Sequence, residues 1–292
     1  MNKIKSGIYG LNGLLDGGIN ENSATVVIGC SGAGKTTLAT QFIRRGLELG
    51  QEGIFVSLDE NKEQIIREAI QMGWKKIVDY IDEEKLVFID ASGIEFSAFI
   101  KKELPSFVAD WKGANARISI DPLTPVMWSS NDRYEQRELI GFMLKETRKV
   151  GTVLATLEEH GMAGDLSGNE TVIPMYLADC VIHLKSIQNT DQGLQRCLKI
   201  MKCRSSRHSK MEHKYTIVKG LGLIVNPENS SLSPTKQKPE EFQKMLDASK
   251  NKVPARVYKR LTDVLEELRD DDFSNIELEV LMSEIISEYS ED

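Results

Sequence analysis

The sequence predicts an α/β fold in which helices flank a mainly parallel sheet, with antiparallel strands at one edge and a helical extension at the C-terminus. Three observations predict it. Apolar runs rich in β-branched residues alternate with helical patterns through the first half of the chain. Further short strand patterns then follow one another without helices between them. The last part of the chain carries apolar residues at helical spacing.

Five apolar runs predict strands, at 25–29, 53–60, 86–92, 116–121 and 151–159. Helical patterns separate them, at 35–49, 61–73, 95–111 and 133–149. Strands that alternate with helices in this way are typical of βαβ units around a buried parallel sheet.

The pattern changes after residue 160. Residues 160–175 are polar and contain glycine, which predicts a loop. Four strand-like runs follow, at 180–185, 194–203, 213–218 and 221–225. Because their links are short, we expect antiparallel strands added to the edge of the sheet.

We divide the chain into a main domain (1–226), a linker (227–239) and an acidic amphipathic helical tail (240–292). The linker is rich in Pro and Ser. One helical stripe in the tail consists of Val253, Val257, Leu261, Val264, Leu265 and Leu268. Ser274 and Glu277 match a capping box for a last helix. The tail either packs back on the main domain or forms an arm for a partner or for self-association. We favour the arm slightly, because such a helix after a linker is separable from the core.

Composition and charge narrow the class of protein. No apolar run is long enough for a membrane span and the start lacks a signal-peptide core, so we expect a cytoplasmic protein without a membrane partner. The four cysteines lack metal-type spacing, which favours small buried side chains. Residues 227–292 hold 16 acidic and 9 basic residues, which accounts for the whole net charge of −7. The main domain is therefore neutral and unlike a polyanion binder.

The run Gly29–Thr36, GCSGAGKT, satisfies the phosphate-loop pattern GxxxxGK[ST] between a strand and a helix. Glycines let successive N–H groups point at one phosphate, and the helix adds its positive end. Lys35 would contact the β- and γ-phosphates, and the Thr36 hydroxyl would bind Mg²⁺. The predicted nucleotide-binding residues are Cys30, Ser31, Gly32, Ala33, Gly34, Lys35, Thr36 and Thr37.

A phosphate loop also needs an acid for the Mg²⁺ shell, at the end of a neighbouring buried strand. Asp121 fits, although it could instead be a turn residue before Pro122, and Asp90 is its rival. Hydrolysis further needs a group that orients or deprotonates water. We expect Glu60 to act as the base and Asp59 to support it, the alternative being that both are solvated loop residues.

Several motifs, in this order, resemble the KaiC-like branch of the RecA superfamily over residues 4–225, in an archaeal-type form with a single such domain. They are IKSGIYGLNGLLDGGI, GCSGAGKT, FVSLDE, QMGWK, LVFIDAS, RISIDPLT and KIMKCRSSRH. The resemblance implies a RecA-type P-loop NTPase core that binds ATP and Mg²⁺ and assembles as a homo-oligomer, often a hexameric ring with ATP between subunits. It also implies that Lys202 and Arg204, in the pattern Lys-x-Arg, reach the γ-phosphate of the neighbouring subunit.

The chain departs from that family at two points. Asp59 is shorter than the glutamate that is common there, which suggests slow hydrolysis. The single domain and the acidic tail differ from the two-domain clock protein, so a clock role is not implied.

These features predict an ATP-hydrolysing oligomeric switch with a regulatory role. One alternative is a regulatory ATP-binding protein that hardly turns over, like relatives that dock on archaeal motility machines. Another is a recombinase-like protein that binds single-stranded DNA. Residues 158–175 disfavour DNA, because they carry four acids and no Lys or Arg, whereas the hairpin 199–214 is basic. Autophosphorylation at Ser167 or Thr171 is a minor alternative.

Overall fold

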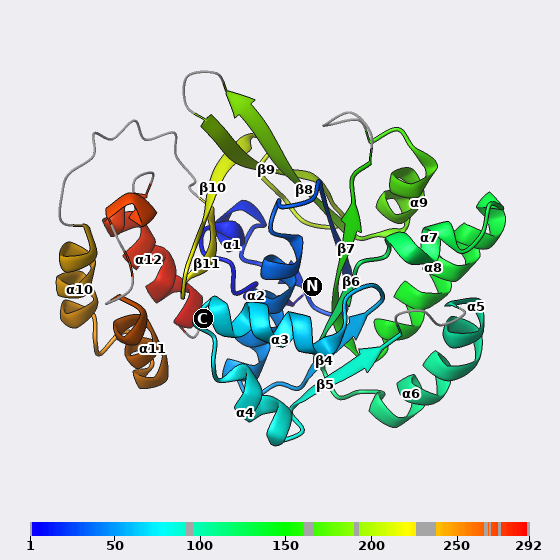
Figure 1. Ribbon diagram of the computed structural model, residues 1–292, viewed down its shortest axis with the longest axis horizontal. Coiled ribbons are helices and arrows are strands. Elements are labelled where there is room, and N and C mark those ends of the chain that lie inside the picture. Colours follow the sequence, from blue (N-terminus) through cyan, green and yellow to red (C-terminus); the bar gives the residue numbers. More distant parts are fainter. Residues whose placement is uncertain are drawn as a thin grey trace.

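We describe a computed structural model of the chain over residues 2–91, 96–160, 166–189, 193–225, 238–265, 268, 270–273 and 276–290. A nine-stranded sheet in the order β11-β10-β9-β8-β3-β7-β6-β4-β5 runs through its centre (Figure 1). The six strands from β8 to β5 are parallel, and β9, β10 and β11 are antiparallel. This is the predicted α/β class, with the architecture of a RecA-type core.

The strands of the large sheet are β3 (Ala24–Gly29), β4 (Gly53–Ser57), β5 (Leu86–Asp90), β6 (Ala116–Asp121), β7 (Gly151–Glu158), β8 (Cys180–Asn189), β9 (Gly193–Cys203), β10 (Glu212–Val218) and β11 (Gly222–Val225). A small sheet near the N-terminus pairs β1 (Lys3–Ile4) with β2 (Ile19–Asn20) around the short helix α1 (Leu11–Leu14). The five strands predicted before residue 160 are all present.

The helices of the main domain are α2 (Lys35–Glu48), α3 (Lys62–Gln71), α4 (Ile77–Asp82), α5 (Phe96–Ala98), the π-helical turn η1 (Phe99–Glu103), α6 (Leu104–Trp111), α7 (Thr124–Trp128), α8 (Arg133–Thr147) and α9 (Asn169–Leu177). The tail contains α10 (Lys238–Ala248), α11 (Ala255–Leu265), the 3₁₀ turn η2 (Asp270–Phe273) and α12 (Leu278–Tyr289). The short helices α4 and α7 had not been predicted.

The prediction of a loop over residues 160–175 was wrong, because α9 occupies Asn169–Leu177. This helix makes β7-α9-β8 a crossover unit, so β8 pairs in parallel with β3 on one side, while it pairs antiparallel with β9 on the other, as predicted. Polar residues and glycine at the start of the segment hid the helix, whose Val172 and Tyr176 are exposed.

Alternate residues of the strands face two apolar clusters, one on each side of the sheet. Val27 packs with α2, α3 and α4, whereas Val26 and Ile28 pack with α6, α7 and α8. Both faces of the parallel strands are therefore buried, which explains why these strands are apolar throughout.

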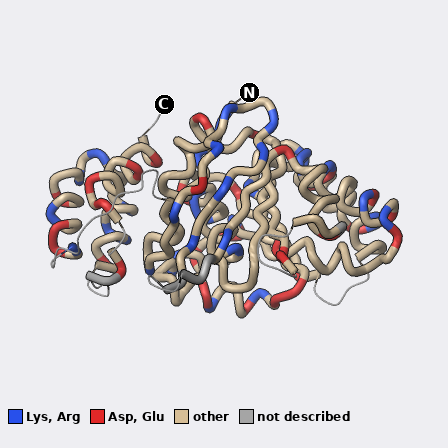
Figure 2. The backbone as a smooth tube through the Cα atoms, turned by 90° about the horizontal axis from the view of Figure 1, so that it is seen from above, with Lys and Arg blue, Asp and Glu red and all other residues tan. Residues whose placement is uncertain are grey.

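The tail helices pack on the main domain beside β10 and β11 (Figures 1 and 2). They share one apolar cluster with Tyr9, Val218, Leu221 and Ile224 of the main domain. The contact at α11 is close, because a Cβ built on Gly220 would lie 2.3 Å from Val264 Cγ1. Of the two interpretations of the tail, the structure thus shows the packed one, and the preference for a separate arm was wrong for this stripe. Its members Val257, Leu261 and Leu265 are buried.

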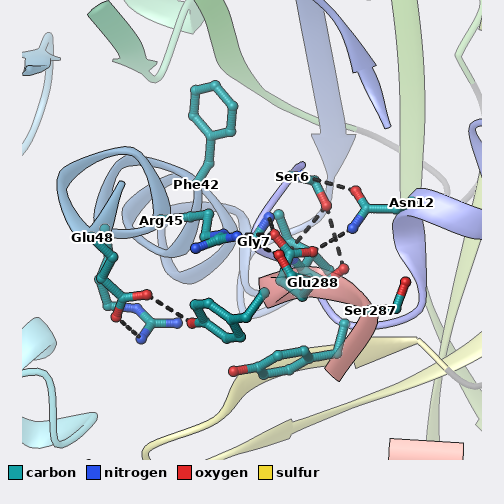
Figure 3. Close-up of polar contacts among 12 residues, drawn as sticks. Ser6, Gly7, Asn12, Phe42, Arg45, Glu48, Ser287 and Glu288 are labelled. Atoms are coloured by element: carbon teal, nitrogen blue, oxygen red, sulfur yellow. Dashed lines mark hydrogen bonds and ion pairs between the residues drawn. The ribbon is translucent and has the colours of Figure 1, made fainter. Parts of the chain in front are cut away.

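A buried ionic network joins the last helix to the P-loop helix (Figure 3). Glu288 of α12 accepts from Arg45 Nε of α2 at 2.9 Å and from the Gly7 backbone N–H at 3.0 Å. The Asn12 amide also donates to Glu288. Both charged side chains are at most 3% exposed. The C-terminal helix is therefore anchored inside the main domain.

Most of the predicted linker and Ser274 of the predicted capping box lie outside the described residues, and α10 begins at Lys238, within the predicted linker. Among the helices that the structure describes, none combines the length and apolar character that crossing a membrane requires.

Candidate nucleotide site

The phosphate-loop residues lie where the sequence predicts, between the end of β3 and the start of α2. Gly32 and Gly34 have φ angles of 76° and 89°, in the left-handed region that glycine adopts readily. A Cβ added at Gly32 would meet no described atom within 4 Å, so the loop is open on that side. Ser31 is exposed, while Cys30, Thr36 and Thr37 are half-buried. The backbone thus forms a cradle that one anion can enter.

Lys35 lies at the centre of this cradle. Its Nζ donates to the carbonyl oxygens of Gly29 at 2.9 Å and of Cys30 at 3.0 Å. The side chain is buried although it is charged. A phosphate group would offer this ammonium a charged acceptor in place of two neutral carbonyls, and charge-assisted hydrogen bonds are the stronger kind.

Asp121 ends β6 next to the loop and is 6% exposed. Burial raises the pKa of its carboxyl, while hydrogen bonds from the Thr156 and Thr36 hydroxyls and the charge of Lys35 act in the opposite direction. The predicted metal pair, Thr36 and Asp121, is therefore brought together.

Asp90 is disfavoured by the strand order. Its strand β5 is the outermost on this side, four strands from β3, and Asp90 is exposed. Strand β6, which carries Asp121, is only two strands from β3. Within the described ranges, no three His, Cys, Asp or Glu side chains form a metal cluster. One carboxylate and one hydroxyl suit Mg²⁺, which binds phosphate oxygens and water through few protein ligands.

Asp59 and Glu60 follow β4, which ends three residues earlier than predicted, at Ser57. Both are exposed. The packing around the Glu60 carboxyl nevertheless raises its pKa, and the negative charges of Glu68, Asp121, Asp59 and Glu158 raise it further. Glu60 therefore lies close to the Asp121 side of the site and is more basic than an ordinary glutamate.

Lys202 and Arg204 lie away from the phosphate loop, beside the last turn of α9. Lys202 Nζ donates to the Met175 and Tyr176 carbonyls at 2.8 and 3.2 Å, and Arg204 Nη2 donates to the Tyr176 carbonyl at 2.9 Å. These carbonyls belong to the last turn of α9, where the helix dipole favours cations. Burial lowers the pKa of Lys202, as does the nearby charge of Arg204.

The strand register places this pair far from the P-loop of the same chain. Cys203 pairs with Cys180, which pairs with Thr25, four residues before Gly29. At about 3.3 Å per residue, Arg204 lies on the order of 15 Å from the loop along the strand direction. The two cations therefore lie at the end of the parallel strands opposite to the P-loop.

Sequence reasoning missed the residues that support the site from neighbouring strands. The Tyr215 hydroxyl of β10 donates to the Ala33 carbonyl at 2.7 Å and thereby ties the loop to the antiparallel edge. Thr156 of β7 donates to Asp121. No short motif surrounds either residue, because each acts through a partner that is distant in sequence.

Several residues named for the autophosphorylation and DNA-binding alternatives form hydrogen bonds or ion pairs within the chain. Thr171 is buried, and its hydroxyl donates to the Leu166 and Gly168 carbonyls at the start of α9. Glu159 Oε2 lies 2.9 Å from His183 Nε2, and both side chains are almost fully buried. On the basic hairpin, Glu212 lies within ion-pair distance of Lys185 and Lys199. Asp165 lies outside the described residues.

Comparison with known proteins gives a family match. The family model described as "ATPase: KaiC" matches residues 4–230. Similar proteins include "Circadian clock protein KaiC3" of Synechocystis sp., 28% identical over 237 residues, which are 77% of this chain and 46% of that protein. Another is "Circadian clock oscillator protein KaiC" of Thermostichus vulcanus, 29% identical over 242 residues, with 76% and 44% covered. The chain thus spans less than half the length of these relatives. Both are cyanobacterial, so an archaeal type stays a prediction.

Proposed function

This chain belongs to the KaiC family of ATPases, and on that premise we propose that it hydrolyses Mg²⁺-ATP at a site shared by two subunits and acts as a regulatory switch. One observation carries the proposal. Lys35 and Thr36 of the phosphate loop lie beside the buried carboxyl of Asp121.

The roles follow from this geometry. The loop N–H groups and Lys35 bind the β- and γ-phosphates, and Thr36 and Asp121 hold Mg²⁺. When bound, the ion neutralises charge on the phosphate oxygens. Glu60 takes a proton from the attacking water, for which its raised pKa is favourable. Asp59 adds negative charge beside it.

Lys202 and Arg204 act in the neighbouring subunit's site. They lie at the opposite end of the strands from the P-loop of their own chain. A ring in which subunits pack head to tail would therefore bring them to the nucleotide of the next subunit. There a cation offsets charge on the transferred phosphoryl group. We propose a homo-oligomeric ring, hexameric by analogy with the family.

Steady-state phosphate release tests the reaction. We expect Lys35→Ala to lower the rate by about 10²-fold or more, because one preorganised donor to the phosphates is lost. Lys145→Ala, an exposed lysine on α8, is the matched control and should keep the rate. Equal rates for the two variants would refute hydrolysis at this site. ATP binding with assembly but no release would instead indicate a regulatory ATP-binding protein.

Mixing inactive subunits tests the shared site. In a random 1:1 mixture of Lys35→Ala and Arg204→Ala chains, about one quarter of the interfaces combine an intact P-loop with an intact arginine. We expect activity to return to roughly that fraction of the wild-type rate. A mixture as inactive as its parts would show that Arg204 does not act across an interface.

A further inference from the structure

A cavity of about 320 Å³ lies between the main domain and the tail, walled by α2, α4 and α11. Seven cationic and two acidic side chains line it, so its lining carries a formal charge of +5. The chain as a whole carries −7. A concentration of positive charge in an acidic protein points to an anionic occupant.

The inner wall of the cavity holds two guanidinium groups and one carboxylate. Glu48 Oε1 lies 2.9 Å from Arg44 Nη1 and 3.6 Å from Arg260 Nη1, and all three side chains are at most 12% exposed. The other Glu48 oxygen accepts from the Tyr289 hydroxyl at 2.7 Å. One positive charge is therefore left over at a buried place, where an uncompensated charge is costly.

Donors also exceed acceptors at this wall. Nε and Nη2 of Arg44 and Nε of Arg260 have no hydrogen-bond acceptor among the described residues. Arg260 Nη2 donates to two neutral hydroxyls, those of Tyr9 and Tyr289, at 3.4 and 3.3 Å. Buried donors in folded proteins are usually satisfied. The wall is thus short of negative charge and of acceptors.

The rim of the cavity is cationic on both sides. Lys75 and Lys76 come from the main domain, and Arg256 and Lys259 come from α11. All four are exposed, and none has an ion-pair partner within the described part of the chain. Like charges that face one another across a cavity repel, so an anion between them would stabilise the contact of the tail with the main domain.

Between the charges the wall is apolar and aromatic. Trp74 is 2% exposed, stacks under Arg44 at 5.0 Å and donates its indole N–H to the Gly220 carbonyl. Ile77 and Val264 are buried beside it, and Tyr80 is half-buried. A mixed wall of this kind, with a volume near the lower end of ordinary ligand pockets, suits a small organic molecule that carries anionic groups.

We propose that this cavity binds a phosphorylated small molecule with at least two negative charges, and that the ligand bridges α11 and the P-loop helix α2. Its phosphate groups lie among the rim lysines and arginines, and its apolar part lies against Ile77, Tyr80 and Val264. Arg44 and Glu48 belong to the same helix as Lys35, whose 14 residues span about 21 Å. The ligand site is therefore connected to the nucleotide site through one rigid element.

Calorimetric titration with inorganic pyrophosphate tests the proposal on the full chain, with the P-loop saturated by a non-hydrolysable ATP analogue. We expect the double variant Lys75→Ala/Lys259→Ala to weaken pyrophosphate binding tenfold or more. The control Lys145→Ala/Lys244→Ala removes two exposed lysines that do not line the cavity and should bind like the wild type.

Three outcomes would overturn the proposal: no pyrophosphate binding to the wild type, unchanged binding to the cavity variant, or an equal loss in both double variants. The last would mean attraction to charge in general. A second titration, of the Lys35→Ala chain without the analogue, separates this site from the ATPase. Pyrophosphate binding that survives when nucleotide binding is lost supports a second site, whatever the chain does with ATP.

Discussion

The two ends of helix α2 make opposite use of charged side chains. At the first turn, Lys35 donates to two backbone carbonyls, beside a loop that is open at Gly32. Toward the other end, Arg45 is paired with Glu288 of α12, and both side chains are almost fully buried. The first arrangement suits a ligand that comes and goes, and the second suits a permanent contact. One helix thus joins an exchangeable site to a fixed one.

Removal of the Glu288 carboxylate, which pairs with Arg45 of α2, should have the largest effect on stability. Glu288→Ala leaves Arg45 buried without its partner and frees the Gly7 N–H. Breaking a buried ion pair in this way costs about 3–5 kcal/mol. We expect the free energy of unfolding in urea to fall by that amount, and amide exchange in α12 to increase.

Glu279→Ala is the matched control, because Glu279 is an exposed residue of the same helix. Its substitution should change stability by less than about 0.5 kcal/mol. If the two variants were equally stable, the contact between α12 and α2 would not depend on the buried pair of Arg45 and Glu288.

At the nucleotide site, Glu60→Gln should lower the rate of ATP hydrolysis by about 10²-fold or more, because it removes the proton acceptor. Stability should be nearly unchanged. The pKa of Glu60 is raised, so the group loses its negative charge at a higher pH than an ordinary glutamate. The wild-type rate should therefore fall as pH decreases through this raised pKa, and the variant should lack that step. A pH–rate profile measures both.

Exposed Glu63, in the first turn of α3, provides the control for that experiment. Glu63→Gln should keep both the rate and the acid limb. An acid limb that persists in Glu60→Gln would assign the titration to another group, and Asp121 would then be the first to examine, since burial raises its pKa as well.

The smallest effect is expected where the loop is tied to the antiparallel edge. Tyr215→Phe removes one hydrogen bond to the Ala33 carbonyl and no apolar contact. A single neutral hydrogen bond contributes about 0.5–1.5 kcal/mol. We expect ATP affinity, measured by calorimetry, to weaken by roughly two- to tenfold with little change in unfolding. Unaltered affinity would mean that the loop holds its shape without this tie.

The parts of the site that a short stretch of chain encodes could be predicted from the sequence. The phosphate loop needs glycines, Lys35 and Thr36 at fixed spacing, so one segment specifies it. Asp121 could be selected together with a rival, because strand ends are visible in the sequence. The choice against Asp90 required the strand order, which no local pattern contains.

What the sequence alone determined is the α/β alternation, the phosphate loop and the amphipathic character of the tail. Each depends on residues within one or two helical turns or one strand. Only the tertiary structure decided that α9 makes β8 a parallel strand, that Tyr215 supports Ala33 from 182 residues away, and that Glu288 meets Arg45 across 243 residues. The physical reason is that a buried charge or strand pairing is stabilised by its partner in space, and the partner's position along the chain leaves no periodic or local signature.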